Sequence, residues 1–173
     1  MRARQFIGLV SAFLVTVGVA VAPPALAHQS VVLDESDSSP GAGPLLVDGT
    51  VSFAVRAEVV RGERRGFRFR LAKGDTMRVQ LLIEDKAPDN RLRPAQLPRV
   101  TVIDPQGSRI RLSIDERTRF YEPYGGTTYW YLSRVQREAV PGTYRVVVTG
   151  RTSVSVDAVI AVGSREVPGE VRD

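Results

Sequence analysis

Four of the five tyrosines in this chain lie within residues 119–132, together with its single tryptophan. A strand here would place Trp130 and Leu132 on one face and Tyr129 and Tyr131 on the other. We expect the first pair to pack in a core. Exposed tyrosine rings stack on sugars and on protein partners, because they combine flat apolar area with a polar hydroxyl; alternatively, they pack beneath a loop. We predict a binding surface for a glycan or a protein partner at Tyr121, Tyr124, Tyr129 and Tyr131.

Residues for catalysis are few. Nucleophilic catalysis needs a nucleophile beside a base, but the chain has no cysteine, no Gly-x-Ser-x-Gly motif and one histidine, His28. A carboxylate pair is the other option, since two acids can hydrolyse a glycosidic bond. Asp115, Glu116 and Glu122 are candidates, but exposed loops commonly carry this many acids. We therefore predict that the protein is not an enzyme.

Two short segments have metal-binding chemistry. The acidic run 34–37 offers several oxygens for calcium, although it lacks the spacing of an EF-hand loop. If a leader is removed after Ala27, His28 becomes the N-terminus, and its imidazole and free amine can bind copper(II). The simpler interpretation is that a polar residue follows the cleavage site. Copper binding at His28 is our alternative functional hypothesis, and otherwise we expect no cofactor.

The first 27 residues have the pattern of a secretory signal peptide. A short basic start is followed by an apolar run at 6–22 and by the small-residue cleavage motif Ala25-Leu26-Ala27. The alternative is an uncleaved membrane anchor, for which this run is barely long enough. Without cysteine, lipid attachment is excluded. We predict a protein that is secreted to the extracellular space or cell envelope, with no stable membrane insertion after cleavage.

The remaining chain has the period of β-strands. Apolar and polar side chains alternate, which is typical of strands with one buried face, in GFRFRLA (66–72), TMRVQLLIE (76–84), RIRLSI (109–114), TYRVVVT (143–149) and SVSVDAVIAV (153–162). Turn sequences separate these segments. We predict an all-β fold, an antiparallel, jelly-roll-like β-sandwich of about eight strands at 49–163. A flexible N-terminal arm at 28–48 and a flexible C-terminal tail at 164–173 would flank it.

Arginine dominates the basic residues. Of the 24 basic side chains, 22 are arginine, and the loss of Arg2 and Arg4 with the leader would leave 22 basic against 19 acidic residues. This modest excess does not indicate nucleic-acid binding. If the strands that carry the outward arginines are neighbours, these side chains form a basic face suited to phosphate- or carboxylate-bearing polymers. The alternative is the ordinary use of arginine on an exposed sheet, where it pairs with acids and protects strand edges. The outward arginines are Arg68, Arg70, Arg78, Arg109, Arg111 and Arg145.

Three strings, FRFRLAKGDTMRVQLLIE, PRVTVIDPQG and VPGTYRVVVTG, resemble the bacterial pre-peptidase C-terminal domain family. The shared landmarks, across roughly 64–150, are Phe69, Gly74, Asp104, Pro105, Gly107, Gly142, Thr143 and Tyr144. The resemblance implies a secreted β-sandwich with a non-catalytic accessory role. Two features depart from the family pattern: we expect no peptidase on this polypeptide, and a proline-rich loop occupies 86–98. We expect an accessory module that recognises cell-wall polysaccharide or a secreted protein, and no nucleic acid.

Overall fold

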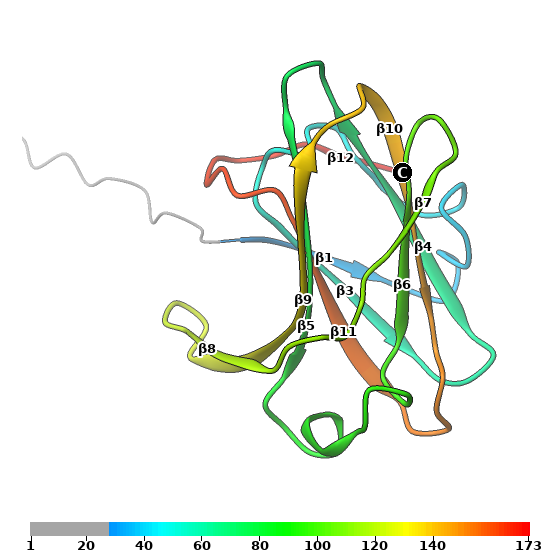
Figure 1. The fold of residues 1–173 in the computed structure, drawn as a ribbon, viewed down its shortest axis with the longest axis vertical. Helices are drawn as coiled ribbons and strands as arrows, with labels where there is room; N and C mark the ends of the chain where they lie inside the picture. The colour runs from blue at the N-terminus through cyan, green and yellow to red at the C-terminus, as the bar shows by residue number, and fades with distance from the viewer. Residues whose placement is uncertain (1–27) are drawn as a thin grey trace, which may run out of the picture.

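The computed structural model describes residues 28–173 as two six-stranded sheets packed face to face (Figure 1). The predicted signal peptide lies outside these residues. Sheet A contains, in spatial order, β1 (Gln29–Leu33), β3 (Phe53–Val59), β11 (Val156–Val162), β5 (Thr76–Glu84), β9 (Thr127–Glu138) and β8 (Thr118–Glu122). Sheet B contains β12 (Val171–Arg172), β2 (Leu45–Leu46), β4 (Arg64–Leu71), β10 (Gly142–Thr149), β6 (Arg99–Ile103) and β7 (Arg109–Arg111). No helix of the described chain is long and apolar enough to cross a bilayer.

The two inner faces form one hydrophobic core, which confirms the predicted all-β fold. Phe67, Phe69 and Leu71 of β4 are buried against the inward residues of the other sheet. Tyr144 stacks on Phe69 with 4.9 Å between ring centroids, so the fifth tyrosine is a core residue. Val154 is 38% exposed, because β11 begins only at residue 156 and the alternation before it belongs to a loop.

The strand pairing differs from the predicted antiparallel sandwich. Both sheets are mixed, because β1 pairs with β3 and β2 pairs with β4 in parallel. Twelve strands are present in the described chain instead of about eight. The extra ones include β1 and β2 within the predicted arm at 28–48, and β12 within the predicted tail at 164–173. These strands have two to five residues, which is too short for a recognisable alternation.

A bulge shapes one edge of sheet A. Leu81 pairs with Ser133 and Leu82 with Tyr131, which leaves Leu132 as an extra residue on β9. A bulge bends its strand and increases the local twist. In Figure 1 the β8–β9 hairpin accordingly bends away from the sandwich, toward the outer side of sheet A. A 3-10 turn, η1 (Asp89–Arg91), lies within the proline-rich loop and also contacts sheet A, through a hydrogen bond between Asp89 and Asp157 of β11.

Candidate functional site

The hairpin closes one side of a cleft on the outer face of sheet A. The cleft has a volume of about 370 Å³, and all six strands of the sheet contribute side chains to it. Its floor is aliphatic, because Leu82, Val159 and Ala161 form a small buried cluster on this outer face. Phe120, from β8, forms part of the wall. The site therefore combines an apolar floor with an opening to the surface.

Three of the four tyrosines predicted to bind a partner line this cleft. Tyr129 and Tyr131 pack on the aliphatic cluster, and Tyr124 extends from the β8–β9 turn with 71% of its surface exposed. Tyr121 does not line the cleft, because it alternates with Phe120 along β8. Trp130 packs against the main core between the two sheets, as predicted. The structure thus brings Tyr124, Tyr129 and Tyr131 together and leaves Tyr121 apart.

Tyr131 is held in place from two sides. Its ring lies 5.4 Å from the ring of Phe120, and the Arg134 guanidinium lies 4.8 Å from its centroid. Burial raises the pKa of the Tyr131 hydroxyl above its ordinary value. Arg134 is itself held by Glu116 through bonds of 2.8 and 2.5 Å. Tyr131 consequently acts as a rigid wall, and the more accessible rings are those of Tyr124 and Tyr129.

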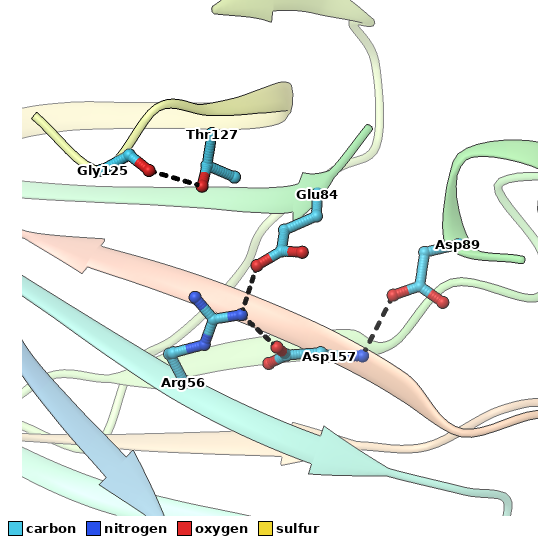
Figure 2. A network of polar contacts seen from close by, with 6 residues as sticks. All are labelled: Arg56, Glu84, Asp89, Gly125, Thr127 and Asp157. Atoms are coloured by element: carbon cyan, nitrogen blue, oxygen red, sulfur yellow. Dashed lines mark hydrogen bonds and ion pairs between the residues drawn. The ribbon is translucent and has the colours of Figure 1, made fainter. Parts of the chain in front are cut away.

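An arginine stands at the polar side of the cleft (Figure 2). Arg56 of β3 donates from Nη2 to Glu84 at 2.6 Å and to Asp157. Burial lowers the pKa of Arg56, but the hydrogen bonds to these carboxylates outweigh it, so the pKa lies above its usual value. Within the described chain, its protein contacts all use Nη2. The Nε and Nη1 groups are therefore available to a ligand.

A third carboxylate supports this network from η1. The Asp157 backbone N–H donates to Asp89 Oδ2 at 3.2 Å, as Figure 2 shows. Burial raises the pKa of Asp89, and the charges of Asp157 and Glu84 raise it further. The side chain is 9% exposed. The proline-rich loop thus places a buried acid behind the Arg56 network.

The carboxylates that the sequence suggested for glycoside hydrolysis have separate local partners in the structure. Both oxygens of Glu122 accept backbone N–H groups of the β8–β9 turn, from Tyr124 at 2.8 Å and from Gly125 at 2.5 Å. Glu116 binds Arg134, whose hydrogen bonds lower the pKa of this carboxyl. The exposed Asp115 donates its backbone N–H to the carbonyl of Leu132. Glu122 and Glu116 thus stabilise the hairpin that forms the cleft.

The predicted metal ligands flank β1, which is the edge strand of sheet A opposite β8. His28 lines the cleft, and its Nδ1 contacts the hydroxyl of Ser52. In the acidic run, Asp34 Oδ1 accepts from the backbone and hydroxyl of Ser36 at 2.7 and 2.6 Å, which closes a local turn. No group of three metal-binding side chains occurs within residues 28–173. Copper at His28 and calcium at 34–37 stay predictions.

Sequence reasoning missed the Arg56 network and the floor of the cleft. One signal was available: Leu82 and Val159 are apolar residues at outward positions of their strands, where polar residues are expected. No protein-family model matches this chain, and no curated protein matches it in sequence. The resemblance to pre-peptidase C-terminal domains therefore stays a prediction.

Proposed function

We propose that this protein is a secreted, non-catalytic binding module of the cell envelope or extracellular space, and that its ligand is a glycan held in the cleft of sheet A. The observation that carries the proposal is the cleft itself, where aromatic rings, an aliphatic floor and a guanidinium with unused donors meet. A jelly-roll-like arrangement of the sandwich and a relationship to pre-peptidase C-terminal domains belong to the same proposal.

A sugar suits this combination of surfaces. The C–H face of a pyranose stacks on an aromatic ring, and Tyr124 and Tyr129 offer such rings. Sugar hydroxyls need donors and acceptors that are already oriented. Arg56 supplies unused N–H groups, and Glu84 and Asp157 hold its guanidinium in one orientation. A ligand would consequently meet a fixed polar group and lose little free energy in ordering it.

A second candidate is a partner protein. The buried floor of Leu82, Val159 and Ala161 favours the insertion of an apolar side chain, because it removes apolar area from water. Such an anchor would sit among tyrosines, which are enriched where interfaces gain most of their binding energy. The same cleft is used in both cases, so they differ in ligand and not in site.

The test compares two tyrosine variants for retention on insoluble cell-wall polysaccharide. We expect Tyr124→Ala with Tyr129→Ala to weaken retention by about tenfold or more, because each lost stacking ring contributes on the order of 1 kcal/mol. Tyr121→Ala is the matched control, since this ring is 60% exposed but lies outside the cleft. Equal retention by the double variant and the control would reject the glycan proposal. Retention of a secreted protein alone, lost in the double variant, would establish the second candidate.

A further inference from the structure

The opposite side of the sandwich, the outer face of sheet B, is covered with arginine. Its strands β4, β10, β6 and β7 are consecutive neighbours (Figure 1), so their outward residues share one surface. These positions hold only Arg, Thr, Gly, Val and Ile, with no carboxylate. We name this surface the arginine face, and its arginines are Arg64, Arg68, Arg70, Arg99, Arg109, Arg111 and Arg145.

These arginines are not paired with acids. None of the seven takes part in an ion pair within residues 28–173. Five of these seven are among the six arginines that the sequence predicted to face outward. The remaining predicted one, Arg78, lies on sheet A. The ordinary use of arginine on an exposed sheet, pairing with nearby acids, therefore does not account for this face.

The arginine face also contains like-charge neighbours that destabilise the fold. Arg68 lies directly opposite Arg145 on the neighbouring strand, and like charges in this position are destabilising. Arg145 is in turn paired with Ile103, which is opposite Arg109 on β7. Three arginines thus line one row across the sheet, in which Arg109 and Arg145 are exposed, whereas Arg68 is half-buried and donates from Nη2 to the Gly43 carbonyl at 2.8 Å. A bound anion would relieve their repulsion.

The spacing suits a chain with regularly repeated charges. Neighbouring strands lie about 4.8 Å apart, and alternate residues of a strand about 6.8 Å apart. Thr143 pairs with Arg70, Thr101 with Arg111, and Thr149 with Arg99, which places hydroxyls beside the guanidinium groups. A groove of about 430 Å³, lined in part by Arg99 and Arg111, continues the face at its β6–β7 edge.

We propose that the arginine face binds an acidic polysaccharide with a carboxylate on each repeat. Charge complementarity carries this proposal: the guanidinium fork pairs edge to edge with a planar carboxylate. Threonine hydroxyls serve the sugar hydroxyls between the charges. Single-stranded nucleic acid is less suited, because the outward positions offer no aromatic ring for base stacking. A lipid surface is less suited, because the outward positions offer no Trp, Phe or Leu side chain for insertion and their apolar residues are only Val147 and Ile103.

The experiment measures binding to polygalacturonate at low salt, with the fully methyl-esterified polymer as the uncharged probe. We expect wild-type protein to bind only the acidic polymer and to release it in high salt. The triple variant Arg109→Gln, Arg111→Gln and Arg145→Gln should bind about tenfold more weakly, because three exposed charge contacts are lost. The matched control makes the same change to glutamine at three cations outside the arginine face, Lys73, Arg78 and Arg91, and should bind as the wild type does.

Several results would overturn the proposal. They are equal weakening by both triple variants, equal binding of the esterified polymer, and no binding by the wild type. Stronger arginine-dependent binding to duplex DNA or to phosphatidylglycerol vesicles would overturn it in favour of those partners. The cleft variant with Tyr124→Ala and Tyr129→Ala should still bind polygalacturonate, which separates this proposal from the proposed function.

Discussion

Replacing Arg56 with methionine removes the cation that holds two acids together, and we expect the fold to lose about 2 kcal/mol. Breaking a buried ion pair costs roughly 3–5 kcal/mol, whereas an exposed pair contributes about 0–1 kcal/mol. Arg56 is intermediate, because its side chain is 29% exposed and those of Glu84 and Asp157 are 22% and 36% exposed. Methionine keeps much of the apolar stem, so the change isolates the lost charge.

Urea unfolding followed by circular dichroism is the assay. With a slope of about 2 kcal/mol per molar urea, a loss of about 2 kcal/mol lowers the midpoint by about 1 M. Arg172→Met is the matched control, because Arg172 and its partner Glu170 are 59% and 58% exposed, and the midpoint should not move. If both variants unfold at the wild-type midpoint, Arg56 does not hold the acids in place. The polar side of the cleft would then lack the rigidity that the proposed function uses.

Two further predictions concern residues beside the binding faces. Gly66→Ala should destabilise the protein by about 1–3 kcal/mol in urea unfolding, because the added Cβ would lie 2.4 Å from the backbone nitrogen of Pro40. Gly41→Ala should be near neutral, because its added Cβ would meet only the Ser39 hydroxyl oxygen, at 4.0 Å. Equal midpoints of the two variants would contradict this packing. Asp89→Asn should stabilise the protein at pH 7. The raised pKa means that ionised Asp89 destabilises the fold, so its favourable contribution is present below its ordinary value of 3.8 and is lost as pH rises through the folded-state pKa. The difference between Asp89→Asn and wild type should therefore disappear at low pH, and a constant difference would contradict the burial argument.

The inward residues were predictable because the alternation of each long strand is a local property. Phe67, Phe69 and Leu71 could be assigned to the core from seven letters of sequence, and the structure buries all three. The parallel partners of β3 and β4 were not predictable in this way. Each is a short segment whose pairing is set by contacts distant in the chain, and no local period marks it.

The cleft was only partly predictable for a related reason. Alternation placed Tyr129 and Tyr131 on the outward face, but the cleft also needs β8 to bend over that face. The bend accompanies one extra residue on β9, Leu132, and this bulge exists only in the register with β5. The sequence indicated a tyrosine-rich strand at 127–132, but neither the strand β8 beside it nor the direction of the hairpin. Phe120, to which the sequence assigned no role, therefore lines the cleft, whereas the predicted Tyr121 does not.

The two outer faces of the sandwich can differ in chemistry, because no side chain belongs to both of them. Residues that face outward on sheet A and those on sheet B are separated by the core, so each face can change without repacking the other. Sheet A uses this freedom for an aromatic cleft around Arg56, and sheet B for arginines that form no ion pair within residues 28–173. If the arginine face holds the protein on an acidic polymer, the cleft points away from that polymer and stays open. Variants of the two faces should then have additive effects on the free energy of binding that retention reports, since distant independent sites do not couple.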